Sequence, residues 1–427
     1  MKQIILALLI HGAAQSAAAQ PLITESEEQY ARSQSARTEA ITAFRSGDLD
    51  TAFTGMMRAL EDRPSNTALL GNAMFLAAET GRLDDAVALN KRHLALGVAP
   101  AGAIQAKLKE KLPESDWTAI EQEIAALSTP VGNAATVAEI PTEYRLVEGV
   151  ASDGKSGFFL STVVSGSLLH MDASGELNLL LDGRPLEANS FFGIAYNRGE
   201  DSLYATYGRV DQTPGHETGA GKTGLLRVNV STKEVTGNWS LPGGTDGKQI
   251  ADIAISSTDQ VFVSEAQSGN IYEVSNDTLK AVETNKTFRS PQGMAFLGGS
   301  LWMVDYGRGL WKINVETGET RLLPVPVDVS LIGIDGLLAH KGRLVAIQNG
   351  VTPHRIIEIN LDEQRESVTA ISVLAQSLKG FDEPTLGTSA ESGIVFVASS
   401  QWPKFGPGGE LRDGQTYNST NIMLLRD

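Results

Sequence analysis

The stretch Pro291-Gln292-Gly293-Met294-Ala295, followed shortly by Leu301-Trp302-Met303-Val304-Asp305, sets the pattern for most of the chain. Its first phrase joins a polar residue and a glycine to small apolar residues. Related phrases recur six times, centred on positions 148, 193, 252, 292, 335 and 383, with spacings of 45, 59, 40, 43 and 48 residues. A period of about 40 to 50 residues made of short apolar runs and turns is typical of a β-propeller with one blade per repeat. The sequence therefore predicts an all-β six-bladed β-propeller.

The polar positions of the phrases are expected to meet on one face of the disc. If each phrase opens the innermost strand of a blade, antiparallel pairing returns the end of the next strand to the same face. The residues predicted to gather there are Glu148, Asp252, Gln292, Asp335 and Glu383 from the phrases, and Asp305, Arg308 and Asn349 from the ends of second strands.

Closure of the propeller is predicted from a count of strands. The sixth repeat ends at residues 421–425, which form only its third strand. Residues 135–146, which precede the first phrase, are therefore expected to supply the missing outer strand and join the two ends of the propeller.

The chain begins with a segment typical of a secretory signal. Met1-Lys2-Gln3 precedes the apolar run Ile4–Ile10 and the small-residue stretch Ser16–Ala19, which predicts a signal peptide over residues 1–19. The apolar run is too short to span a bilayer, so no membrane insertion is expected. The mature protein is predicted to be secreted or periplasmic.

Residues 20–128 have a helical composition and contain a second, shorter repeat. Gly47-Asp48-Leu49-Asp50-Thr51-Ala52 matches Gly81-Arg82-Leu83-Asp84-Asp85-Ala86 at a distance of 34 residues, the tetratricopeptide period. We predict a tetratricopeptide-like helical domain over 20–128, a linker over 129–139 and the propeller over 140–427. Two repeats give little concave surface, which favours a helical cap beside the propeller over a docking surface for a protein partner.

Composition excludes several function classes. The chain has no Cys, which rules out disulfides, thiolate nucleophiles and Cys-ligated metals. With 51 acidic and 35 basic residues, its formal charge is −16, which argues against nucleic acid as a partner. No Ser lies in a nucleophile turn of the Gly-x-Ser-x-Gly type, so a Ser-His-Asp hydrolase is not indicated.

Over residues 140–427 the phrases resemble the family of senescence marker protein, gluconolactonase and luciferin-regenerating enzyme. The resemblance rests on Glu148-Gly149, on Pro291-Gln292-Gly293 with its following strand, and on Ile334-Asp335-Gly336. It implies a six-bladed propeller with a divalent cation in the channel, commonly calcium, with magnesium, manganese or zinc as alternatives. It also implies hydrolysis of lactones or related esters as the activity on a small-molecule substrate.

The family's cation ligands are a Glu on the first blade, an Asn in a Pro-Asn-Gly phrase and an Asp in an Asp-Gly phrase. Carried over by position, they fall on Glu148, Gln292 and Asp335, and Asp335 is also the implied catalytic base. Gln292 departs from the family's Asn by one methylene. Ala251-Asp252-Ile253 departs from the family's Asn-Asp-Gly, in which the Asn contacts substrate.

A second function class stays open. The acidic and amide side chains would also suit a water-filled channel in a non-catalytic exported propeller that binds a small ligand or a partner protein. Against that reading, Glu148 and Asp335 at one channel mouth would repel unless a cation or a shared proton compensates. The candidate substrate-binding residues are Asp252, Asp305, Arg308, Asn349 and Glu383, and residues 212–222, which lengthen the second spacing, are a candidate lid.

Overall fold

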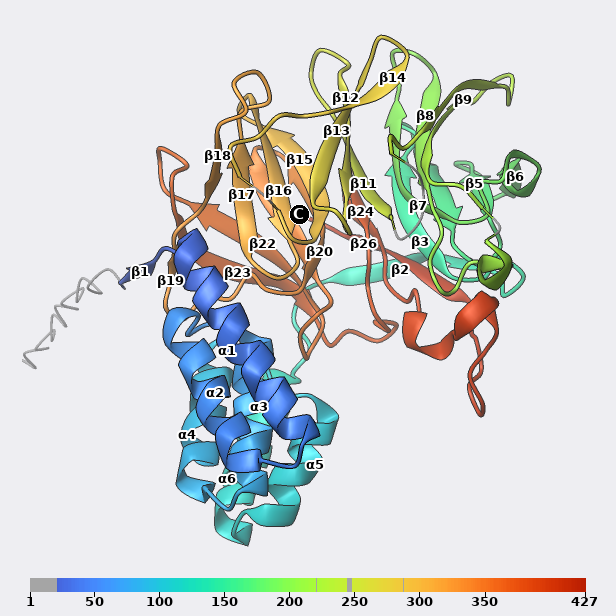
Figure 1. The fold of residues 1–427 in the computed structure, drawn as a ribbon. Helices are drawn as coiled ribbons and strands as arrows, with labels where there is room; N and C mark the ends of the chain where they lie inside the picture. The colour runs from blue at the N-terminus through green and yellow to red at the C-terminus, as the bar shows by residue number, and fades with distance from the viewer. Residues whose placement is uncertain (1–20, 220, 244–247, 287) are drawn as a thin grey trace, which may run out of the picture.

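The computed structural model describes residues 21–219, 221–243, 248–286 and 288–427. They form a helical domain, Glu27–Leu127, docked against one face of a six-bladed propeller (Figure 1). The predicted signal peptide, residues 1–19, lies outside the described residues. Within the described ranges, no helix is long and apolar enough to cross a membrane.

The propeller consists of six four-stranded antiparallel sheets. From the innermost strand outward, blade 1 contains β3 (Val147–Ser152), β4 (Phe158–Thr162), β5 (Ser167–Met171) and β6 (Leu177–Asp182); blade 2 contains β7 (Phe191–Asn197), β8 (Ser202–Tyr207), β9 (Gly224–Asn229) and β10 (Val235–Ser240); blade 3 contains β11 (Ile250–Ile255), β12 (Val261–Glu265), β13 (Asn270–Ser275) and β14 (Thr278–Ala281).

The second half of the ring continues the same order. Blade 4 contains β15 (Pro291–Leu297), β16 (Ser300–Asp305), β17 (Gly309–Ile313) and β18 (Thr320–Leu322); blade 5 contains β20 (Ile334–His340), β21 (Arg343–Gln348), β22 (Arg355–Leu361) and β23 (Val368–Gln376); blade 6 contains β24 (Gly387–Ala390), β25 (Gly393–Val397), β26 (Thr420–Leu425) and β2 (Ala134–Ile140). The six-bladed fold predicted from the repeat is therefore confirmed.

The outer strand of blade 6 comes from before the first blade. β2 pairs antiparallel with β26, from Ala134 opposite Leu425 to Ile140 opposite Thr420. This confirms the predicted closing strand, but the strand covers Ala134–Ile140 instead of residues 135–146. Most of the predicted linker, residues 129–139, therefore belongs to blade 6. The innermost strands also contact their neighbours around the whole ring, with β24 against β3 completing it.

Hydrophobic cores lie between adjacent blades, because each sheet is covered by a neighbour on both faces. The cluster between blades 4 and 5, for example, joins Trp302 and Val304 of β16 to Leu344 and Ala346 of β21. Strands buried on both faces read as continuous apolar runs, which explains runs such as Leu301-Trp302-Met303-Val304.

The polar phrases coincide with β-bulges. The pairing register shifts at the start of five innermost strands, between Val147 and Val150 in β3, and likewise in β7, β11, β15 and β20. A bulge turns a side chain away from the regular alternation, and here it turns the polar residue of the phrase. Glycine follows in several phrases because the next blade's backbone is close: a Cβ at Gly293 would meet the backbone nitrogen of Leu337.

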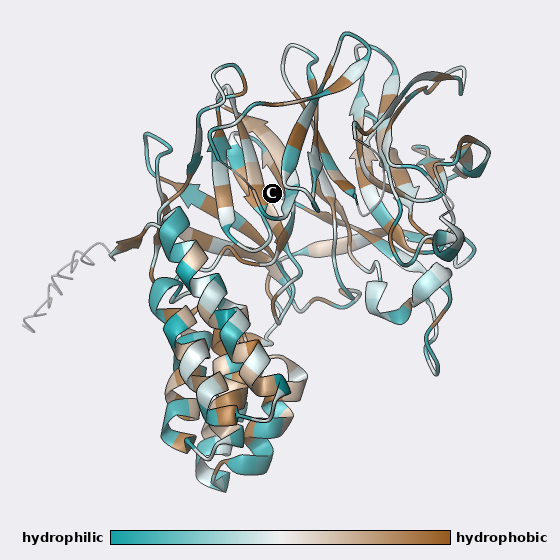
Figure 2. Cartoon of the chain, in the orientation of Figure 1, coloured by the Kyte–Doolittle hydropathy of each residue, from teal (hydrophilic) through white to brown (hydrophobic). Residues whose placement is uncertain are grey.

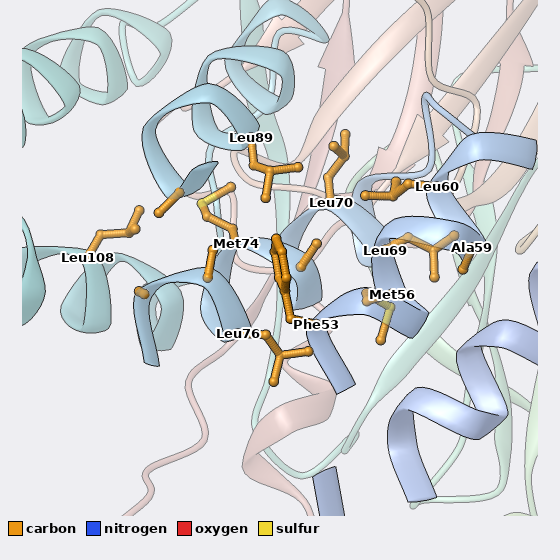
Figure 3. Packing of buried hydrophobic residues seen from close by; sticks show 14 of the residues in the cluster. Phe53, Met56, Ala59, Leu60, Leu69, Leu70, Met74, Leu76, Leu89 and Leu108 are labelled. Carbon is orange, nitrogen blue, oxygen red and sulfur yellow. The ribbon is translucent and has the colours of Figure 1, made fainter. Parts of the chain in front are cut away.

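The helical domain consists of six helices: α1 (Glu27–Arg45), α2 (Leu49–Asp62), α3 (Thr67–Glu79), α4 (Leu83–Ala95), α5 (Gly102–Lys111) and α6 (Glu114–Leu127). The turns of the hairpins α1–α2 and α3–α4 contain Gly47 and Gly81, both with positive φ (83° and 73°), as the repeat predicts. Asp48 caps α2 by accepting from the backbone of Thr51. The core joins Phe53, Leu70 and Met74 (Figure 3). Hydrophobic residues gather on the inner side of the bundle (Figure 2).

The helical domain contacts the loops of blades 4 and 5 that lie on the same face as the starts of the innermost strands. The short strand β1 (Leu22–Ile23) pairs with β19 (Val325–Pro326) beside blade 4. Ser65 Oγ donates to the carbonyl of Val327 (2.7 Å). The domain therefore lies on the face where the polar phrases open.

Candidate functional site

A small cavity in the channel brings together four of the residues singled out from the sequence. It has a volume of about 30 Å³, and its lining includes Glu148, Asp252, Gln292 and Asp335, from blades 1, 3, 4 and 5. A cavity of this size holds a water molecule or a single ion. All four side chains come from the bulged starts of innermost strands.

Glu148 is held from blade 6. Its Oε2 accepts from Trp402 Nε1 (2.6 Å) and from Ser400 Oγ (3.3 Å). Burial, and then the charge of Asp335, raise the pKa of Glu148 well above its usual range. The carboxyl is thus fixed in position but is costly to ionise without a compensating cation.

Asp335 is held within blade 5. Its Oδ2 accepts from Asn349 Nδ2 (2.8 Å), at the end of β21. Burial raises the pKa of Asp335 to about 6, and the hydrogen bond from Asn349 opposes that rise. The group can therefore exchange a proton near neutral pH.

Two further acids surround this pair. Asp252 Oδ2 accepts from the backbone of Met294 (3.0 Å), and burial raises the pKa of Asp252 to about 7. Glu383 precedes β24; burial, and then the charge of Asp335, raise its pKa to about 7, and its buried Oε2 has no hydrogen-bond partner among the described residues. Across the described residues, none of these four carboxyls forms an ion pair.

Three predicted substrate-binding residues are engaged in other contacts. Asp305 accepts from the backbone nitrogens of Arg289 (2.7 Å) and Gly307 (3.1 Å), so it holds a turn together. Arg308 forms ion pairs with Glu25 and Glu27 of the helical side (Nε–Oε1 and Nη1–Oε1, both 2.7 Å). Asn349 binds Asp335. Of the predicted substrate-binding residues, Asp252 lines the cavity. Glu383 does not line it but is close enough to Asp335 for their charges to interact. Asp305 and Arg308 do not line the cavity.

A larger pocket of about 470 Å³ adjoins the small cavity, sharing Gln249 with it. Its lining includes Trp402, whose indole binds Glu148, together with Arg209, Asp211 and Lys248. Residues 209–212, in the insertion after β8, line this pocket. The insertion also contacts residues 398–419 between β25 and β26, called the lobe after β25 below: the backbone nitrogen of Gly408 donates to the carbonyl of Asp211 (2.7 Å). In Figure 1 the lobe, drawn in red, lies beside the green insertion on the face that carries the helical domain.

The oxygen atoms of Glu148, Asp335 and Gln292 are of the chemical type that binds hard cations. Glu148 and Asp335 supply carboxylate oxygens, and Gln292, whose Nε2 donates to Ser290 Oγ (3.2 Å), keeps its amide oxygen for another partner. Oxygen donors of this kind are those that calcium and magnesium prefer. Among the described residues, no three His, Asp or Glu side chains are close enough to hold an ion together, so the fit rests on two carboxylates and one amide.

Sequence reasoning did not identify the partner of Glu148. Trp402 belongs to Ser399-Ser400-Gln401-Trp402, a distinctive segment after β25, but nothing in the segment itself indicates a bond to a residue 254 positions earlier. The only available signal was its location at the end of a second strand, the place where rim residues were expected.

Comparison with known proteins finds matches only among solved structures. No protein-family model matches the chain, and no curated protein does. The PQQ-bound aldose sugar dehydrogenase of Streptomyces coelicolor is 12% identical over 69% of this chain and 98% of its own, with a TM-score of 0.47.

Two other solved structures are similar to the same extent. A luciferin-regenerating enzyme is 11% identical over 69% of this chain and 94% of its own, with a TM-score of 0.46. A gluconolactonase from Xanthomonas campestris is 13% identical over 70% and 92%, with a TM-score of 0.43. Similarity at this level says nothing about the activity of this protein. Its function is therefore inferred from the buried acids of the channel and from the larger pocket beside them.

Proposed function

We propose that the protein is an exported, cation-assisted hydrolase of lactones or related esters. The observation that carries the proposal is the pairing of Glu148 and Asp335 in one cavity, both buried, both with raised pKa values and neither in an ion pair among the described residues. A buried carboxyl without a compensating charge lowers the free energy of unfolding when it ionises, and groups with such perturbed pKa values are concentrated at functional sites. The adjoining 470 Å³ pocket is large enough for a small ring substrate.

Glu148, Gln292 and Asp335 would hold the cation, for which calcium is the first candidate, followed by magnesium, manganese and zinc. When bound, a divalent cation polarises a carbonyl and stabilises the developing oxyanion. Trp402 and Ser400 fix the carboxyl of Glu148, so this ligand is already oriented. Its orientation does not have to be acquired on binding.

Asp335 is assigned as the base. Asn349 donates one hydrogen bond to Oδ2, which keeps a second lone pair that would bind the cation, so Oδ1 would accept the proton of the attacking water. As the water oxygen bonds to the lactone carbonyl carbon and the ring C–O bond breaks, the proton returns from Asp335 to the leaving alkoxide. A pKa raised to about 6 makes this carboxyl a stronger base than an ordinary Asp, while leaving it ionised at neutral pH.

The test is proton release from a panel of sugar and aliphatic lactones with each candidate cation. General-base assistance is worth about 10²–10⁴ in rate, so Asp335→Asn should lower kcat by at least about 100-fold. Asp413→Asn, at an exposed position, is the matched control and should retain full turnover. Absence of turnover by the wild type on every lactone would overturn the hydrolase proposal in favour of a ligand-binding propeller. Full activity of Asp335→Asn would instead remove Asp335 as the base.

A further inference from the structure

The loop of residues 349–354, between β21 and β22, is bound to the strand that carries Asp335. Asn349 donates to the Asp335 carboxyl (2.8 Å), and the backbone nitrogen of Gly350 donates to the carbonyl of Gly333 (2.9 Å). Two hydrogen bonds therefore join this loop, called the Asn349 loop below, to the start of β20. Any displacement of the loop would be transmitted to the Asp335 side chain.

The other side of the Asn349 loop is bound to the helical domain. The backbone nitrogen of Ala99, after α4, donates to the carbonyl of Thr352 (2.6 Å). Val351 is 7% exposed and packs in the hydrophobic core of the helical domain; among the described residues it is the sole propeller member of that cluster. At the base of the loop, buried Arg355 donates to the carbonyl of Gly97 (Nη1, 3.0 Å).

A second loop, residues 306–308 between β16 and β17, is held in the same way. Arg63 of the helical side donates to the carbonyl of Gly307, and Arg308 is paired with Glu25 and Glu27. On its inner side, the carbonyl of Tyr306 accepts from Gly333, two residues before Asp335. The two loops also touch, since a Cβ at Gly350 would lie 2.5 Å from the hydroxyl oxygen of Tyr306.

We propose that the helical domain is a positioning element for Asp335, acting through the Asn349 loop and the 306–308 loop. The inference rests on the proposed function for its catalytic consequence, but the contacts themselves do not depend on it. Loops at the rim of a propeller are ordinarily its most mobile parts. Here two of them are immobilised by contacts from another domain, and both are bonded to Gly333.

The experiment compares Val351→Ala with Leu108→Ala in the full chain. Leu108 is fully buried in α5, in the same hydrophobic cluster as Val351, and belongs to the helical domain. Leu108→Ala should lower the melting temperature at least as much, because it removes more buried carbon. It should leave the Asn349 loop and kcat unchanged.

Val351→Ala should speed amide hydrogen exchange at Gly350 by about tenfold or more, because it loosens the loop that this amide anchors. It should also lower kcat on a lactone by about 10-fold to 100-fold with a smaller change in KM, as expected when a reacting group is misplaced. Val351→Ile, which keeps an apolar β-branched side chain at this position, should leave the exchange rate of Gly350 and kcat near their wild-type values. Val351→Thr, which keeps the shape and adds a hydroxyl, provides a second variant should the alanine variant fold poorly.

The two readouts separate the inference from the proposed function. If the wild type hydrolyses no lactone, the hydrolase proposal fails, whereas the exchange rate at Gly350 still decides whether the helical domain holds the loop. Faster exchange in Val351→Ala or Val351→Thr, but not in Leu108→Ala, supports the inference. Equal exchange and equal kcat in the Val351 and Leu108 variants would overturn it.

Discussion

Two carboxyls line the same cavity but are supported from different parts of the molecule. Glu148 is fixed within the propeller by Trp402 and Ser400 of the lobe after β25. Asp335 is fixed by Asn349, whose loop is packed into the helical domain. One wall of the site thus depends on closure of the ring, and the other on docking of a second domain.

This difference shows how one repeated phrase acquires two roles. The phrase places both acids at equivalent positions of their blades, so the repeat alone makes them alike. Two donors, Trp402 and Ser400, fix the carboxyl of Glu148 as a ligand, whereas the carboxyl of Asp335 accepts from one neutral side-chain donor, Asn349. The first prediction measures the cost of burying a neighbouring acid of the same cavity, Asp252.

The largest expected effect is on stability as a function of pH in the presence of chelator. The pKa of Asp252 rises from 3.8 to about 7 in the folded protein, and those of Asp335 and Glu383 rise as well. A raised folded pKa contributes stability that is present below the unfolded pKa and is lost as pH increases through the folded value. For Asp252 alone the loss between pH 4 and pH 8 is about 4 kcal/mol, at about 1.36 kcal/mol per pKa unit.

Urea denaturation of wild type and Asp252→Asn across that pH range measures this loss. In Asp252→Asn the free energy of unfolding should fall by about 4 kcal/mol less between pH 4 and pH 8 than in the wild type. The remaining pH dependence should be that of Glu148 and Asp335. Equal slopes for the two proteins would show that Asp252 does not carry the expected penalty.

A somewhat smaller effect is expected from breaking the helical support of the Asp335 wall. The Arg308 side chain is 1% exposed and faces two acids. Arg308→Met should lower the free energy of unfolding by about 3 kcal/mol, because it removes a buried cation and leaves Glu25 paired with Arg63 alone of its two arginine partners. Arg32→Met, which removes a pair with Asp62 from a side chain 59% exposed, should cost less than about 1 kcal/mol. A similar cost for the two variants, read from denaturant midpoints, would contradict the buried clamp.

The smallest of these effects concerns the Glu148 wall. Trp402→Phe keeps an aromatic side chain but removes the shorter of the two hydrogen bonds to Glu148 Oε2. Because Ser400 still donates to that oxygen, the cost should be about 1 kcal/mol, the lower end of the penalty for a buried acceptor that loses a donor. Trp302→Phe is the matched control, because its indole binds the carbonyl of Leu297 away from the site (3.0 Å). Both should lose stability, and only Trp402→Phe should weaken cation binding. Equal cation affinity in the two variants would separate Trp402 from the site.

The propeller and the position of the channel acids could be predicted from sequence because they repeat. A polar residue within a short apolar strand, recurring at blade spacing, locates Glu148, Asp252, Gln292 and Asp335 at one end of the channel. Closure of the ring follows from the count of strands, as β2 shows.

The hydrogen-bond partners of those acids could not be predicted, because they lie in loops after second strands, whose conformations the repeat does not determine. Asn349 and Arg308 were both assigned to substrate, yet one binds Asp335 and the other binds Glu25, 283 residues away in the chain. The face on which the helical domain docks decides the contact of Arg308, whereas Asn349 contacts Asp335 within blade 5. Neither the 34-residue helical repeat nor the blade period contains that information.

The most direct test of the site is calorimetric titration of chelator-treated protein with calcium, and then with magnesium, manganese and zinc, in buffers of different ionisation enthalpy. We expect one cation-binding site. Binding should release protons near pH 6, because carboxyls with raised pKa values must lose their protons to bind a cation. This proton release should decline as the pH rises. Glu148→Gln and Asp335→Asn should each abolish binding. If none of the four ions binds the wild type, or if binding persists unchanged in both variants, the buried carboxyls of the channel are not a cation site.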